Sequence, residues 1–182
     1  MLGGPGAGKG TQAKRLGRAL NIPWISTGDI FRDAIASDTD LGREVKGYVE
    51  RGDLVPDRTA IALMRERLQQ DDAASGWILD GYPRTAFQAE ELDMLLDDLG
   101  QTLDKAIYLN VSEAVLVERS VQRSAIDDDP ETIRRRIAVL HETTVPMLDY
   151  YSYRKMLVDV DGALAPEQVQ ETLWAALGLS TS

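Results

Sequence analysis

Apolar residues recur every three or four positions along most of this chain, which is the spacing of one face of an amphipathic helix. Four short apolar runs interrupt that pattern and indicate strands. The helical spacing predicts helices at residues 9–20, about 41–49, 56–68, 87–99, 115–121, 130–151 and 166–177, with another starting at 26–29. The apolar runs predict strands within residues 21–26, at 77–79, at 105–110 and at 156–160.

Strands that alternate with helices are typical of an α/β fold with a parallel sheet covered by helices on both faces. Pro23 favours a sheet edge for the strand within residues 21–26, because proline cannot donate to a strand ladder. Ligands of such folds bind outside the carboxyl ends of the strands. The polar motifs of this chain follow its predicted strands, so we expect its site there.

Composition limits the functions that need to be considered. A length of 182 residues with 43% apolar residues fits one domain spanning 1–182. The chain has no cysteine and one histidine, which excludes disulfides and multi-histidine metal sites. A net charge of −10 argues against non-specific nucleic-acid binding. Neither a membrane-spanning stretch nor a secretory signal is found, so a cytoplasmic protein that binds no membrane is expected.

The clearest motif is the glycine-rich segment at residues 3–11, Gly-Gly-Pro-Gly-Ala-Gly-Lys-Gly-Thr. Its glycines allow backbone N–H groups to turn toward phosphate oxygens, and a helix N-terminus follows them. Lys9 supplies a charge for the β- and γ-phosphates, and a nearby hydroxyl can approach Mg²⁺. The segment predicts a P-loop three-layer fold that binds a nucleoside triphosphate.

Arginines identify a second candidate feature, because phosphoryl transfer depends on positioning and on positive charge around the migrating group. A guanidinium holds two oxygens at once and keeps its charge. The candidates lie near strand ends or in the polar break between two helices: Arg32, Arg84, Arg119, Arg123 and Arg136.

Asp80 ends the strand at 77–79 and allows two interpretations. It can organise Mg²⁺ through water at the phosphate end of the sheet. It can equally be a turn or helix-capping residue. The sequence leaves both open.

Together these motifs resemble the adenylate kinase family, in its short-lid form. The resemblance runs in order from residue 2 to about residue 175, and the Asp-Gly-Tyr-Pro-Arg segment is highly specific to nucleoside monophosphate kinases. The matching segments are 3–11, 26–32, 52–56, 80–85 with Gln88, Glu118-Arg119 with Arg123, 127–128, Arg136 and 150–151.

The resemblance implies a core, a monophosphate-binding insert at about 26–55 and a short lid at about 122–133. It also implies a Mg²⁺-dependent reaction, ATP and AMP giving two ADP, in a monomer whose partners are these small nucleotides. The implied catalytic residues are Lys9, Asp80, Arg84, Arg119, Arg123 and Arg136. The implied ATP-binding residues are Gly6, Ala7, Gly8, Lys9, Gly10, Thr11, Arg119, Arg123 and Leu164, the last through the backbone at 162–164. Those implied for AMP are Thr27, Arg32, Asp53, Leu54, Val55, Gly81, Tyr82, Pro83, Arg84, Gln88 and Arg136. No protein side chain is expected to bind the metal directly; Thr11 and Asp80 would lie nearby.

Thr27 and Gln88 favour AMP as the acceptor. Uridylate and cytidylate kinases resemble the chain as well, but they tend to have alanine after the serine that corresponds to Ser26. A glutamine amide can pair with the adenine edge through one donor and one acceptor. A kinase for UMP or CMP stays open as an alternative.

Two departures from the family pattern leave a third alternative, a nucleotide-binding homologue with impaired catalysis. Ala125 stands where the family's lid usually has an arginine, and loss of such a group commonly costs about 10²–10³ in rate. Only Met1 and Leu2 precede the phosphate loop, where the family has four or five apolar strand residues. The first strand is therefore expected to be truncated and the loop to be loosely held.

Overall fold

The computed structural model describes the backbone of residues 1–123 and 129–179, and all their side chains except that of Arg123. Its strands are β1 (Trp24–Ser26), β2 (Ile78–Asp80), β3 (Ala106–Asn110) and β4 (Leu157–Asp161). Its α-helices are α1 (Lys9–Leu20), α2 (Thr27–Ala36), α3 (Asp40–Arg51), α4 (Asp57–Leu68), α5 (Ala86–Leu99), α6 (Glu113–Arg123), α7 (Pro130–Val139), α8 (Val145–Tyr153) and α9 (Pro166–Ala176). Among the described residues, no helix is both long and apolar enough to cross a membrane.

All strand pairs in the structure are parallel, as predicted. β1 pairs with β2, with Ile25 opposite Leu79, and β3 pairs with β4, with Tyr108 opposite Asp159. The predicted strands are confirmed to within one to three residues, and β1 lies at an edge.

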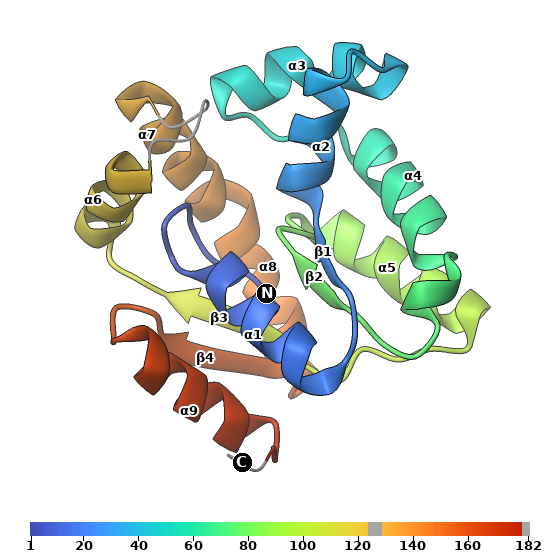
Figure 1. Ribbon diagram of the computed structural model, residues 1–182, viewed down its shortest axis with the longest axis vertical. Helices are drawn as coiled ribbons and strands as arrows, with labels where there is room; N and C mark the ends of the chain where they lie inside the picture. Colours follow the sequence, from blue (N-terminus) through green and yellow to red (C-terminus); the bar gives the residue numbers. More distant parts are fainter. Residues whose placement is uncertain (124–128, 180–182) are drawn as a thin grey trace.

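Met1 and Leu2 join the two strand pairs into one sheet. The Met1 amine donates to the Leu79 carbonyl at 2.7 Å, and the Leu2 N–H donates to the Ile107 carbonyl at 2.7 Å. The Leu2 carbonyl in turn accepts from the N–H of Leu109 at 2.9 Å. Figure 1 shows the amino terminus between β2 and β3. The predicted short first strand is thus an isolated bridge between Leu2 and Tyr108, and Met1 and Leu2 together are hydrogen-bonded on both sides.

Helices cover both faces of the sheet, because strands such as β3 carry apolar side chains on both faces. The side chains of β3 alternate between faces. Ile107 and Leu109 pack in one core with α1, α6, α7 and α9, whereas Ala106 and Tyr108 pack in another with α5 and α8. This arrangement confirms the three-layer α/β fold.

A smaller core lies apart from the sheet, where Phe31, Val45 and Val55 pack together. It holds α2 against α3, and Figure 1 shows this pair projecting beyond the strands, with α3 beside α7. Both α2 and α3 begin at N-caps. The side chains of Ser26 and Thr39 accept from the backbone N–H groups three residues onward.

The predicted single helix at 130–151 is wrong in one respect. Pro130 does occupy its first turn, behind an Asp129 cap, but a π-helical turn at Leu140–Thr144 separates α7 from α8. Pro146 follows that turn and has no N–H to complete an α-helical hydrogen bond. The wider π turn accommodates this missing bond inside an otherwise continuous helical segment.

Candidate active site

A cavity of about 570 Å³ opens at the carboxyl ends of the strands. The phosphate loop forms one side of it. Gly8 caps α1 with a left-handed φ of 93°, a conformation that favours glycine, so that the helix starts directly at Lys9. Gly10 and Thr11 of the first turn also line the cavity, and this turn contains no acidic residue. The loop therefore presents helix-start N–H groups and a lysine to the cavity, which suits a phosphate group.

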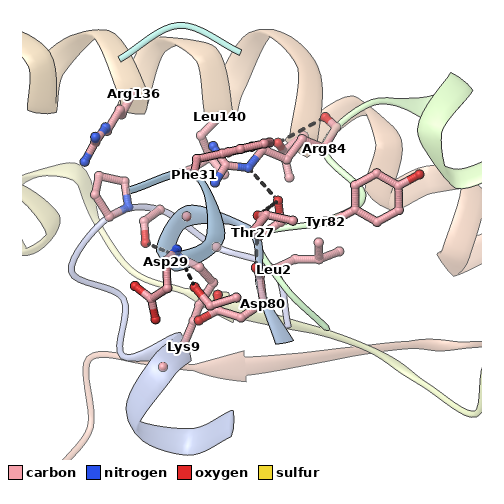
Figure 2. Close-up of a pocket in the computed structure, with 18 of the residues that line it drawn as sticks. Leu2, Lys9, Thr27, Asp29, Phe31, Asp80, Tyr82, Arg84, Arg136 and Leu140 are labelled. Atoms are coloured by element: carbon pink, nitrogen blue, oxygen red, sulfur yellow. Dashed lines mark hydrogen bonds between the residues drawn. The ribbon is translucent and has the colours of Figure 1, made fainter. Parts of the chain in front are cut away.

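Lys9 is held in place by the loop, because its Nζ donates to the Gly4 carbonyl at 2.9 Å. Asp80 lies beside it at the end of β2 (Figure 2). Its Oδ2 accepts from the indole N–H of Trp24 at 3.4 Å and faces Gly10. Asp80 thus points toward the phosphate loop from the end of β2, and it caps neither α2 nor α5, whose N-caps are Ser26 and Thr85.

Arginines form the opposite side of the cavity. Figure 2 shows Arg84 and Arg136 across the cavity from Lys9. Burial lowers the pKa of Arg84, the Asp80 carboxylate opposes that shift, and the charges of Arg136 and Arg32 lower the pKa further. The Nε of Arg84 donates to the Gly81 carbonyl at 2.7 Å, which directs its terminal nitrogens. Three guanidiniums therefore act on one another within the cavity, where an anion would relieve their repulsion.

Arg119 reaches the cavity from α6 and ties it to the segment after β4. Its guanidinium donates to the carbonyls of Gly162 at 2.7 Å and Ala163 at 2.9 Å. A Cβ on Gly162 would lie 3.2 Å from the Ala7 carbonyl, so this segment also borders the phosphate loop. Gly162 therefore lies beside the phosphate loop, and the contact of the backbone at 162–164 with the ATP base stays a prediction.

The segments after α3 and β2 form a further part of the cavity wall. Leu54 and Val55 line the cavity from the segment after α3, Tyr82 lines it from the segment after β2, and Gln88 lines it from α5. The hydroxyl of Thr27 donates to the carbonyls of Asp80 and Gly81, at 3.2 and 3.1 Å. Its methyl group is thereby turned away from those carbonyls, and the α2 N-terminus is fixed against the end of β2.

Most of the site residues predicted from the sequence line this single cavity: Gly6, Gly8, Lys9, Gly10, Thr11, Thr27, Arg32, Asp53, Leu54, Val55, Asp80, Gly81, Tyr82, Arg84, Gln88, Arg119 and Arg136. Ala7 and Pro83 are buried beside it, and Leu164 is 40% exposed outside it. The side chain of Arg123 and all of Ala125, Asp127 and Asp128 lie outside the described residues.

Sequence reasoning missed several lining residues. Lys14 lines the cavity with its Nζ 4.4 Å from the ring centre of Trp24, and its place four residues after Gly10 on α1 was a signal available in the sequence. Phe31 and Leu140 also line the cavity. Both are apolar residues at helical spacing, and nothing in the sequence distinguishes them from core residues.

The cavity contains two side chains, Thr11 and Asp80, that were predicted to lie near a metal ion. Among the described residues, no group of three or more His, Asp or Glu side chains could hold a metal ion. Thr11 and Asp80 both line the cavity, and one hydroxyl with one carboxylate fits Mg²⁺, which usually keeps several waters and binds substrate phosphates.

Comparison with known proteins agrees with this geometry. The family model described as adenylate kinase matches residues 1–156. The chain is 54% identical over 177 residues to "Adenylate kinase 2" of Synechocystis, covering 97% of this chain and 98% of that protein. It is 45% identical over 181 residues to "Adenylate kinase" of Thermobifida fusca, covering 97% and 96% respectively. The chain therefore belongs to the adenylate kinase family, which consists of nucleoside monophosphate kinases that act as phosphotransferases.

Proposed function

We propose that this chain catalyses the reversible, Mg²⁺-dependent transfer of the γ-phosphoryl group of ATP to AMP in the cavity described above. The observation that carries the proposal is the opposition of the phosphate loop and the arginine group across one cavity. Two phosphate chains meeting there would be surrounded by positive charge from both sides. Phosphoryl transfer depends on such positioning and electrostatic stabilisation.

ATP binds on the loop side in this proposal. Backbone N–H groups from Gly6 to Thr11 bind its phosphates, and Lys9 follows the transferred group. Arg119 and Arg123 bind the phosphates from α6, and the backbone at 162–164 meets the base. The bonds between Arg119 and residues 162 and 163 support this arrangement, because they connect the proposed phosphate and base contacts.

AMP binds on the side formed by residues 26–55 and by the segment after β2. Arg32, Arg84 and Arg136 bind its phosphate. Thr27, Leu54, Val55 and Gln88 surround its base, with the neighbouring residues Asp53 and Gly81 to Pro83 shaping the pocket. The separate small core of α2 and α3 supports treating residues 26–55 as an insert that moves as a unit. The lid of this proposal spans residues 122–133.

An oxygen of the AMP phosphate attacks the γ-phosphorus, and the bond to the β-phosphate oxygen breaks, which leaves ADP on both sides. The arginines keep their charge throughout, so no protein group has to give up or take a proton. Bound Mg²⁺ would neutralise charge on the ATP phosphates, with Thr11 and Asp80 positioned to hold its waters. Closure of insert and lid would exclude water and so prevent hydrolysis.

The test is ADP formation from ATP and AMP, measured in a coupled assay with CMP and UMP as alternative acceptors. We expect AMP to give the highest kcat/KM. Folded protein that forms no ADP would overturn the proposal. Calorimetric binding of both nucleotides without turnover would instead identify an impaired homologue, and a higher kcat/KM with CMP or UMP would identify a pyrimidine nucleotide kinase.

We further propose a cytoplasmic monomer, because a net charge of −10 disfavours self-association and the insert has to move freely. Light scattering at assay concentration tests the oligomeric state.

A further inference from the structure

The side-chain amide of Gln88 is bonded at both ends. Its Nε2 donates to Oδ1 of Asp57 at 2.7 Å, and its Oε1 accepts from the backbone N–H of Arg84 at 2.8 Å. A carboxylate can only accept and a backbone N–H can only donate. These two contacts therefore fix which end of the amide is nitrogen and which is oxygen.

Asp57 holds the Gln88 amide from outside the cavity. It is the first residue of α4 and does not line the cavity, whereas Gln88, on α5, does. The same Oδ1 atom accepts from the hydroxyl of Thr85 at 3.3 Å, and that hydroxyl accepts from the backbone N–H of Gln88 at 3.1 Å. Gln88 is only 2% exposed, so a changed orientation would disturb packed neighbours. Asp57 thus holds both the amide and the start of α5.

The orientation of the amide matters for the base that it meets. Beyond the two contacts, the amide nitrogen has a second hydrogen and the amide oxygen a second lone pair. A 6-aminopurine presents a donor at N6 and an acceptor at N1. A 6-oxopurine presents the reverse, an acceptor at O6 and a donor at N1. An amide held in one orientation can match only one of these patterns.

We infer that Asp57 is a positioning residue that sets selectivity for a 6-aminopurine monophosphate over a 6-oxopurine monophosphate, by holding the Gln88 amide in one orientation. The inference rests on the proposed role of Gln88 in binding the acceptor base. It adds a residue 31 positions away in the sequence that acts on the base through Gln88.

The test compares Asp57→Ala with the unmodified chain, using AMP and inosine monophosphate as acceptors. Loss of a hydrogen bond to a charged group predicts a rise of about tenfold or more in the KM for AMP. The KM for ATP should stay unchanged, and the ratio of kcat/KM for AMP over inosine monophosphate should fall by a similar factor. Asp57→Asn retains an acceptor oxygen, so it should restore the KM for AMP to within about threefold.

Two controls separate positioning from general damage. Asp72→Ala removes a carboxylate that pairs with Arg67 outside the cavity, and it should change neither KM nor the ratio. In a Gln88→Ala background, Asp57→Ala should have no further effect on the KM for AMP, because its effect passes through the amide. If Asp57→Ala does not fold, as judged by its thermal transition, Asp57→Ser serves instead, since its side chain is too short to reach the amide.

Calorimetric dissociation constants for both monophosphates are measured in parallel, so that the selectivity between them can be compared even in a chain without turnover. An unchanged selectivity ratio in folded Asp57→Ala or Asp57→Ser, or an additive loss in the Gln88→Ala background, would overturn the inference alone. A chain that binds AMP but forms no ADP would overturn the proposed function alone. A chain that does not bind AMP would overturn both.

Discussion

At the scale of the residue, the buried guanidinium of Arg84 is the group on which the other charged side chains of the cavity act. Burial lowers its pKa, and the charges of Arg136 and Arg32 add to that effect, while Asp80 opposes it. A cation kept close to other cations is best stabilised when an anion binds among them. Arginine remains charged in proteins, and within the protein Asp80 and the Asp29 carboxylate that pairs with Arg32 oppose this repulsion.

We expect Arg84→Lys to lower kcat/KM for AMP by about 10²–10³. A lysine keeps the charge but lacks the planar fork that bonds the Gly81 carbonyl through Nε and leaves two terminal nitrogens for phosphate oxygens. Steady-state kinetics checks the loss. Arg67→Lys is the matched control, since Arg67 pairs with Asp72 away from the cavity and should leave kcat/KM unchanged. Equal activity in the two variants would argue that charge alone matters at residue 84.

At the scale of the element, the segment after α3 is tied to α7. Arg135 and Arg51 both donate to the Asp53 carboxylate, at 2.7 and 3.0 Å, and lower its pKa. The hydroxyl of Thr132 donates to the Glu50 carbonyl at 3.1 Å. These contacts connect the α2–α3 unit to the helix that carries Arg136.

We expect Arg135→Ala to raise the KM for AMP by about twofold to fivefold at low ionic strength, because an exposed ion pair contributes little and is screened by salt. The difference should disappear near 1 M salt. Arg43→Ala is the control: it removes an exposed ion pair with Asp38 and Asp40 that does not reach α7. A salt-independent change would show that Arg135 acts in some other way.

Local signals explain which elements the sequence predicted. Ser26 and Asp129 are followed by the helix starts that their capping chemistry favours, and both are confirmed. The π turn at Leu140–Thr144 was missed because Pro146 permits either a kink or a wider turn, and tertiary packing decides between them. The bond from Asp57 to Gln88 joins residues 31 positions apart on two different helices, so the periodicity within each helix does not indicate it. The predicted site residues gather in one cavity because they follow parallel strands, whose carboxyl ends share an edge.

At the scale of the whole molecule, two residues connect the halves of the sheet. Met1 and Leu2 are 8% and 3% exposed and bond to strands on either side. The expected loose attachment of the phosphate loop is therefore opposed by bonds from both neighbours. Burial of the charged terminal amine works against these bonds, and it lowers the pKa of that amine from 8.0 to about 6. Asp80 raises this pKa and Lys9 lowers it further.

We expect the free energy of unfolding to rise as pH increases from about 6 to 8, by up to about 2–3 kcal/mol. In that window the unfolded chain holds a proton on the Met1 amine that the folded chain has released, so raising the pH favours folding. Below about pH 6 both states are protonated and this gain is absent. Urea unfolding across the window measures the slope.

Amino-terminal acetylation supplies the control for this slope, because it removes the titrating group while leaving every side chain unchanged. An acetylated chain with the same pH dependence would show that other groups cause it. Four or five apolar residues added before Met1 should remove the titration too and raise the melting temperature, by continuing the central strand.

The pairing of Leu2 with Tyr108 also constrains the order of events during folding. Residues at the very start of the chain complete the centre of the sheet only after more than a hundred later residues are available to meet them. Contacts so distant in sequence are slow to form, because a large loop has to close first. During synthesis the phosphate loop would therefore wait for β3 before it reaches its final shape. Until then, its glycines and the apolar residues beside them would depend on the nascent chain's other contacts for protection from aggregation.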